Sequence, residues 1–262
     1  MAEQNNAAPA ASRGKTWGLC FVVGGLYGVL GQIIWTLVYP ACGDALTAAV
    51  TLLLLGVVAI VMYIPGIHQK IAAVSGFGSI LPFNGFACGV ADAYEAGAAA
   101  GGPSGGVKAV VKMFVGMVVL GGVIAMAGGL VGAFVKAPTV PMPVPTTGAM
   151  LFLTAFITGG CICLLFQIIF EFTHCPVPTL LIIGLALGGW LTMFGITTAL
   201  GAFGGCGFVI MVIGAGTALY NTTMLAVSGN VVPLLIIWGV FIALAVVGIV
   251  CGAGNLKVKG GK

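Results

Sequence analysis

Six stretches of about 20 or more mostly apolar residues dominate this sequence, and each is long enough to cross a bilayer as a helix. They are residues 17–39, 45–64, 107–134, 149–172, 177–198 and 231–251. Of the 262 residues, 60% are hydrophobic and only 5% are charged. A soluble domain has about 25% charged residues, so this chain cannot cover a water-facing surface. We expect an all-α, multi-pass integral membrane protein, which excludes a soluble enzyme and a nucleic-acid-binding protein.

Two further segments, residues 71–97 and 200–229, are apolar but interrupted by glycines, and the first also by Pro82. Broken backbone at membrane depth is tolerated only where it is buried in protein or lines a wet cavity. We therefore expect each segment to form a re-entrant or discontinuous helix. The alternative is a pair of ordinary, slightly irregular spans.

The sequence predicts two halves joined by a proline-rich connection, because each proline of KAPTVPMPVPTTG stiffens the chain. The expected division is a polar N-terminal tail (1–16), a first repeat (17–136), a linker (137–148), a second repeat (149–255) and a basic C-terminal tail (256–262).

The two halves share motifs. Two glycines, six other residues and Gln-Ile-Ile occur from Gly24 and again from Gly159. A Gly-x-Gly motif begins at Gly76 and again at Gly205. The spacing between Gly76 and Gly205 also separates Gly66 from Gly195, Gly85 from Gly214, and Asp92 from Asn221. Such matches are hard to obtain by chance, so we interpret the halves as copies.

Each copy is expected to hold three full spans and one broken element, and an odd number of spans inverts the second copy. Inverted repeats place a pathway at their interface, near the midplane. With the N-terminus inside, every Lys and Arg except Lys136 falls on the cytoplasmic side, as the positive-inside rule favours. If the broken segments instead cross the membrane fully, the distribution of Lys and Arg agrees slightly less well with the positive-inside rule.

No motif for a catalytic site, a metal site or a nucleotide site is present. The eight cysteines form no C-x-x-C pair, and most are expected to pack as small hydrophobic residues. We expect no enzyme activity and no cofactor. Any flux is then passive or driven by a gradient.

The segments FVVGGLYGVLGQ (21–32) and FITGGCICLLFQ (156–167) both resemble the first-span signature of the stage V sporulation protein A family, in its C and E members. GFGSILPFNGF (76–86) resembles that family's G-x-G-S-x-x-P-x-x-G-F segment. The second half keeps Gly205-x-Gly207 but lacks the serine, the proline and the final phenylalanine. The chain, from residue 17 to about 255, resembles a fused two-copy member with a degenerate second copy.

This resemblance implies membrane passage of dipicolinic acid, with calcium, into the forming spore and out at germination. It also implies a tension-gated channel, as the C member is regarded. We expect such a conduit in the bacterial cytoplasmic or inner spore membrane. The alternatives are a secondary transporter of another small organic anion and a non-conducting subunit of a larger sporulation complex. Expected partners are the lipid bilayer, the anionic solute, and other subunits of this family or further copies of the chain.

Gln32 and Gln167 are the matched polar residues within spans. A glutamine in hydrocarbon either bonds to a neighbouring helix or lines the pathway, and both interpretations stay open. The segment from Gly76 to Gly85 is the best candidate site, because a half-helix starting near Pro82 would present a partly positive end to a carboxylate. The alternative is a hairpin packed through small residues. The pathway candidates in these segments are Gly76, Gly78, Ser79, Pro82, Asn84, Gly85, Gly205 and Gly207.

Asp92 and Glu95 share one helical face and offer hard oxygen ligands that suit calcium. Simple solvation near a helix end is the alternative. Asn221, at the position matched to Asp92, keeps an oxygen and drops the charge. Lys108 and Lys112 lie one turn apart, where they either attract an anion or anchor the helix to anionic lipid.

Overall fold

A computed structural model describes residues 13–137, 144–145, 147–148 and 150–260. The polar tail up to residue 12, most of the predicted proline-rich linker and the last two residues lie outside this description. Within the described residues every regular element is a helix, and five helices are long and apolar enough to cross a membrane, or six if one bent pair counts as a span. The expected all-α, multi-pass membrane protein is confirmed.

The first helix, α1 (Arg13–Tyr63), consists of two sections joined at a sharp bend. Gly43 at the bend has a φ of 60°, which glycine adopts without strain. The sections Arg13–Gly43 and Leu46–Tyr63 are both candidate spans. They confirm the predicted spans 17–39 and 45–64.

The next predicted pair of spans is half confirmed. Helix α6 (Leu151–Thr173) covers the predicted span 149–172. The span predicted over 177–198 is bent, because α7 (Val177–Met193) ends before residue 198 and α8 (Ile196–Gly204) leaves it at 102°; the pair forms either one broken span or a re-entrant loop. Gly195, between them, has a φ of 74°, a conformation that commonly ends helices.

The first glycine-rich segment is broken as predicted. It forms α2 (Ile67–Ser75), α3 (Phe77–Ile80) and the start of α4 (Phe83–Met113), with breaks at Gly76 and at the extended Pro82. The predicted end at residue 97 is wrong. The chain stays helical to about residue 100 and turns at Gly101 and Gly102, so the next long helix begins before the predicted residue 107. That helix continues through the π-helical turn η1 (Phe114–Val119) into α5 (Leu120–Phe134).

The second glycine-rich segment follows the same plan. It contains α8, α9 (Cys206–Val209) and α10 (Val212–Val227), with breaks at Gly205 and at the extended Met211. The last helix, α11 (Val232–Gly260), covers the predicted span 231–251. The backbones at the matched glycines agree closely, with φ of 50° at Gly76 and 49° at Gly205.

Helices α1 and α6 cross at the repeated glycine pairs. A Cβ atom at Gly24 would lie 2.6 Å from the Cys163 sulfur, and one at Gly159 would lie 2.7 Å from the Gly24 carbonyl oxygen. Beside the crossing, the rings of Phe21 and Phe156 pack edge to face at 5.6 Å. Small residues thus allow these helices the close approach that membrane helices favour.

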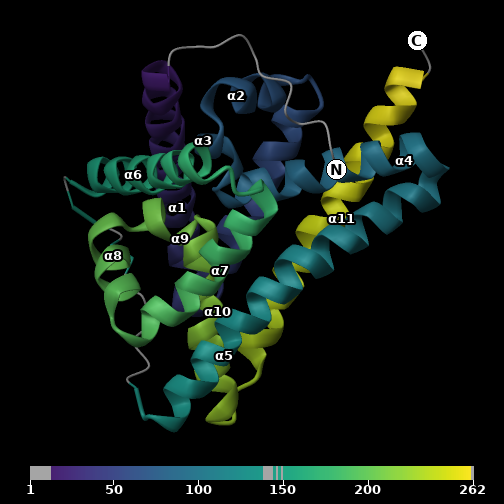
Figure 1. Cartoon of the computed structure of the whole chain (residues 1–262). Coiled ribbons are helices and arrows are strands. Elements are labelled where there is room, and N and C mark those ends of the chain that lie inside the picture. The colour runs from purple at the N-terminus through teal and green to yellow at the C-terminus, as the bar shows by residue number, and fades with distance from the viewer. Residues whose placement is uncertain (1–12, 138–143, 146, 149, 261–262) are drawn as a thin grey trace.

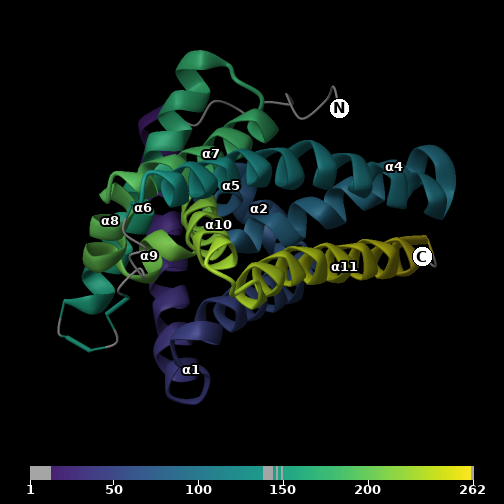
Figure 2. The same cartoon turned by 90° about the horizontal axis from the view of Figure 1, so that it is seen from below.

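The long helix that ends each half packs against the other half. A Cβ atom at Gly129 on α5 would lie 2.8 Å from the Tyr220 carbonyl oxygen on α10, and one at Gly252 on α11 would lie 2.8 Å from the Ala91 carbonyl oxygen on α4. Figure 1 shows α11 and α5, the last helix of each half, running in opposite directions, and Figure 2 shows α4 and α11 reaching out to the same side. The halves are therefore entwined around one shared core.

Candidate functional site at the crossing of two broken helices

The two broken segments meet where their helices are interrupted. Pro82 and Met211 pair in an antiparallel bridge. The Phe83 N–H donates to the Ile210 carbonyl at 2.9 Å, and the Val212 N–H donates to the Leu81 carbonyl at 3.3 Å. The bridge therefore supplies hydrogen-bond partners to backbone groups that a broken helix leaves without an intrahelical one.

Gln32 on α1 binds the broken segment of the second half. Its side-chain oxygen accepts the Cys206 N–H at 2.9 Å, and its Nε2 donates to the Pro145 carbonyl at 3.0 Å. The side chain is fully buried. Its acceptor thus satisfies the amide that follows the break at Gly205.

Gln167 on α6 makes the corresponding contact with the first half. Its oxygen accepts the Phe77 N–H at 3.0 Å, immediately after the break at Gly76. Its Nε2 donates to Glu171 at 2.8 Å, and Glu171 also accepts the Trp17 indole N–H at 3.0 Å. Each glutamine therefore caps the broken helix of the opposite half.

The candidate glycines are positions where backbone and side chains approach closely. A Cβ atom at Gly76 would collide with the Gln167 side-chain oxygen, and one at Gly205 with that of Gln32. At Gly78 it would lie 2.6 Å from the Cys20 carbonyl oxygen, and at Gly207 it would meet the Ala155 carbonyl. These glycines let the broken segments lie against α1 and α6.

Ser79, Gly85 and Asn84 complete the first-half segment. Ser79 is fully buried and donates to the Gly76 carbonyl at 3.4 Å, while a Cβ atom at Gly85 would lie 2.5 Å from the Ser79 carbonyl oxygen. Asn84 is also fully buried, yet neither atom of its amide has a hydrogen-bond partner. Asn84 is therefore, with Asn221, one of two candidates that carry a buried polar atom without such a partner.

Asp92 and Glu95 belong to a second polar cluster, about two helical turns along α4 from Asn84. The Tyr63 hydroxyl lies 2.7 Å from an Asp92 oxygen and 2.9 Å from a Glu95 oxygen, and Asn255 donates to the same Glu95 oxygen at 2.7 Å. Asn221, on α10, does not join this cluster. Its half-buried side chain carries an oxygen without a partner.

Sequence reasoning missed three polar residues that lie next to the candidate residues in the fold. Tyr27 lies beside Asn84, and Tyr63 and Asn255 contact the two carboxylates of the second polar cluster. A tyrosine or an asparagine near a span end is ordinary in membrane sequences. No sequence signal singles out Tyr27, because only the tertiary fold brings it close to Asn84.

The cysteines and the acidic side chains are scattered through the described part of the chain. No group of three or more His, Cys, Asp or Glu residues there is placed to hold a metal ion. All eight cysteines are free, and five of them are buried. The two carboxylates are instead hydrogen-bonded to neutral side chains.

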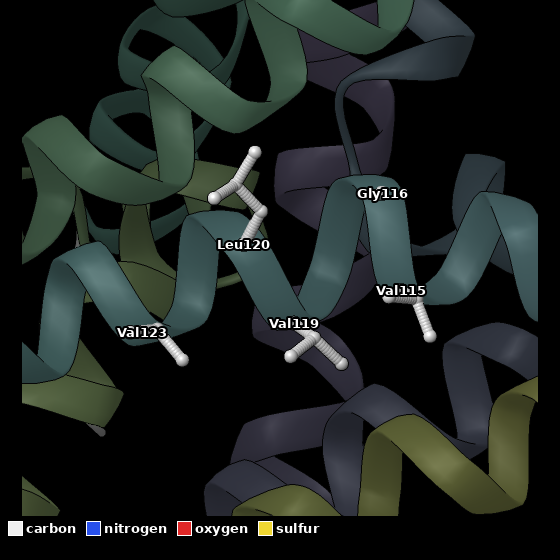
Figure 3. A pocket seen from close by; sticks show the side chains of 5 residues that line it. All are labelled: Val115, Gly116, Val119, Leu120 and Val123. Atoms are coloured by element: carbon white, nitrogen blue, oxygen red, sulfur yellow. The ribbon is translucent and has the colours of Figure 1, made fainter.

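A recess on the outer side of the helices is not part of the crossing. Its volume is about 380 Å³, and it lies along one side of η1 and α5. Figure 3 shows Val119 and Val123 pointing to one side of this helix and Leu120 to the other. A recess lined by Val115, Gly116 and these side chains offers no group that recognises a charged solute.

Comparison with known proteins identifies the first half. The family model of the SpoVAC/SpoVAEB sporulation membrane protein matches residues 17–135, which include α1, the first broken segment and α5. No curated protein and no solved structure matches the chain. Residues 17–135, which make up most of the first half of this chain, are thus similar to the SpoVAC/SpoVAEB sporulation membrane protein family.

Proposed function

We propose that the chain is a passive conduit, opened by membrane tension, for dipicolinate and calcium in sporulation and germination. The family match over residues 17–135 supports a role in sporulation. The crossing supports a pathway, because transporter sites lie where discontinuous helices meet near the midplane. The observation that carries the proposal is the reciprocal capping by Gln32 and Gln167.

The proposal includes two copies in inverted orientation. Residues matched by motif contact each other's halves in corresponding ways, as Gln32 with Cys206 and Gln167 with Phe77 do. The opposite directions of α5 and α11, the last helix of each half, in Figure 1 support the inversion. Under this arrangement the bridge at Pro82 and Met211 lies on the pseudo-two-fold axis, where a pathway is expected.

The close packing of the crossing corresponds to a closed conduit in this proposal. The glycine contacts at Gly78 and Gly207 leave little room between the broken segments and α1 or α6. Opening therefore requires α1 and α6 to separate from the bridge. Lateral tension on the bilayer favours an expanded cross-section and supplies a driving force for that separation.

Efflux from liposomes tests the proposal. Vesicles that contain only this protein are loaded with calcium dipicolinate and subjected to osmotic downshift, with protein-free vesicles as the control. The proposal predicts fast release of dipicolinate that depends on the downshift. No release under either condition contradicts it and favours a non-conducting subunit that needs other members of the family or further copies of the chain.

A secondary transporter of a small organic anion is the second candidate, favoured by the two broken helices that cross at matched positions. Such a protein alternates access by rocking one repeat against the other. Its flux saturates with solute concentration and shows counterflow without tension. A conduit shows neither, so the same vesicles separate the two.

Calcium is placed at Asp92 and Glu95 in this proposal, since they are adjacent carboxylates. Asn255 and Tyr63 already donate to them, so calcium would displace one of these donors. Substituting both carboxylates by amides is expected to remove any calcium dependence of flux while dipicolinate release persists.

A further inference from the structure

The two halves differ in polarity beside the crossing. Tyr27 on α1 and Asn84 on α4 are polar, whereas the motif-matched residues of the second half are Ile162 and Ile213. Tyr27 is 6% exposed and Asn84 is fully buried. The fold thus accommodates an isoleucine at each of these positions in one half and keeps a polar side chain in the other.

Neither polar side chain is satisfied by the protein. The Tyr27 hydroxyl interacts with the Asn84 side chain only at long range, and neither the hydroxyl nor either amide atom has a partner within ordinary hydrogen-bond geometry. Buried polar groups almost always have one, and a buried group without one destabilises the fold. An unsatisfied pair inside a membrane protein is therefore a functional-site hypothesis.

The surrounding chemistry favours an anion. Asn84 is the second residue of α4, whose first turn carries partial positive charge. The Phe83 N–H is already bonded to Ile210, so the free donors are the hydroxyl of Tyr27 and the amide NH₂ of Asn84. A calcium ion requires six to eight oxygen ligands, and this pair supplies only two.

We propose that Tyr27 and Asn84 bind a carboxylate group of the anion that passes the crossing. The inference rests on the proposed function and extends it, because it locates selectivity in the first half alone. The carboxylate accepts from the tyrosine hydroxyl and from the asparagine amide. The second half, with Ile162 and Ile213 at the matched positions, then supports the crossing without contacting the solute.

The test uses two variants that remove the donors and one matched control. Asn84→Ile installs the second-half residue, Tyr27→Phe removes one hydroxyl, and Ile213→Val changes the matched site. Each full-length protein is assayed for release of dipicolinate and of its neutral diamide from vesicles. In detergent, thermal unfolding is measured with and without dipicolinate, which reports binding independently of flux.

The wild type is expected to prefer dipicolinate over the diamide and to be stabilised by dipicolinate. Loss of a hydrogen bond to a charged group corresponds to a fall of about 10- to 100-fold. Asn84→Ile and Tyr27→Phe should each lose that much of the preference, together with the stabilisation. Without ligand, both should unfold at or above the wild-type temperature, because an unsatisfied polar group is gone. Ile213→Val should keep both the preference for dipicolinate and the stabilisation by dipicolinate, although its loss of a buried methyl group lowers the unfolding temperature without ligand.

Two results overturn the inference. One is an unchanged preference and unchanged stabilisation by dipicolinate in both variants. The other is an equal loss of dipicolinate and diamide release, which indicates a damaged pathway. If the wild type releases nothing yet is stabilised by dipicolinate only when both donors are present, the proposed function fails and the binding site stands.

Discussion

Pro82 and Met211 pair in an antiparallel bridge, although they lie in different halves and at matched positions of the two Gly-x-Gly segments. Residues on either side complete the pairing through reciprocal backbone hydrogen bonds. The structural centre of the molecule is thus a contact between corresponding residues. The glutamine caps, the glycine breaks and the last helices of the two halves are likewise arranged in corresponding pairs around this contact.

The glutamine caps are expected to be equally important in both halves. Gln32→Leu leaves the Cys206 N–H buried without a partner, and Gln167→Leu does the same to the Phe77 N–H. Each change should lower the free energy of unfolding by about 1–3 kcal/mol and reduce flux while membrane insertion persists. Unfolding in detergent and vesicle efflux measure the two effects. Leu26→Ala, at an exposed position of α1, is the control.

Gly76→Ala and Gly205→Ala should be more damaging than alanine at other left-handed glycines. All four positions Gly66, Gly76, Gly195 and Gly205 have positive φ, which costs a non-glycine residue about 1–2 kcal/mol. Only at Gly76 and Gly205 does the new Cβ also collide with a capping glutamine, because space is open at the other two. The order of unfolding temperatures checks this, and equal losses at all four positions would refute the cap.

Two tyrosines should respond oppositely to the same change. Tyr63→Phe removes hydrogen bonds to Asp92 and Glu95 and should destabilise the protein by about 1–3 kcal/mol. Tyr220→Phe removes a buried hydroxyl that has no partner, so stability should be unchanged or slightly higher. Thermal unfolding of both variants in one detergent decides the matter. A large loss in Tyr220→Phe would mean that its hydroxyl has a partner in the membrane.

Sequence alone predicted most spans and both broken segments, because long apolar runs and clustered glycines are local signals. It did not predict the bend after Met193 or the continuation of α4 to residue 100. A glycine that ends a helix and one that packs within a helix look alike in an apolar sequence. Only the tertiary fold decides between the two uses.

The contacts among the candidate residues could not be predicted from the sequence. Gln32, Gln167, Gly76 and Gly205 were identified from repetition alone, and the structure brings them together in reciprocal pairs. The repeated pattern alone could not decide whether the two glutamines pack against a neighbouring helix or line a pathway. Tyr27 was missed because its neighbour Asn84 lies on another helix and approaches it only where α4 packs against α1.

The opposed orientation of the two halves is the central claim, since the proposed pathway depends on it. It predicts that Cys175, between α6 and α7, faces the cytoplasm and that Cys42, at the bend of α1, faces the other side. The measurement is labelling of single-cysteine variants in intact cells by a membrane-impermeant maleimide, with a cysteine-free variant as the control. The account predicts that Cys42 reacts in intact cells and that Cys175 reacts only after the membrane is opened. Reaction of both cysteines from the same side would contradict it.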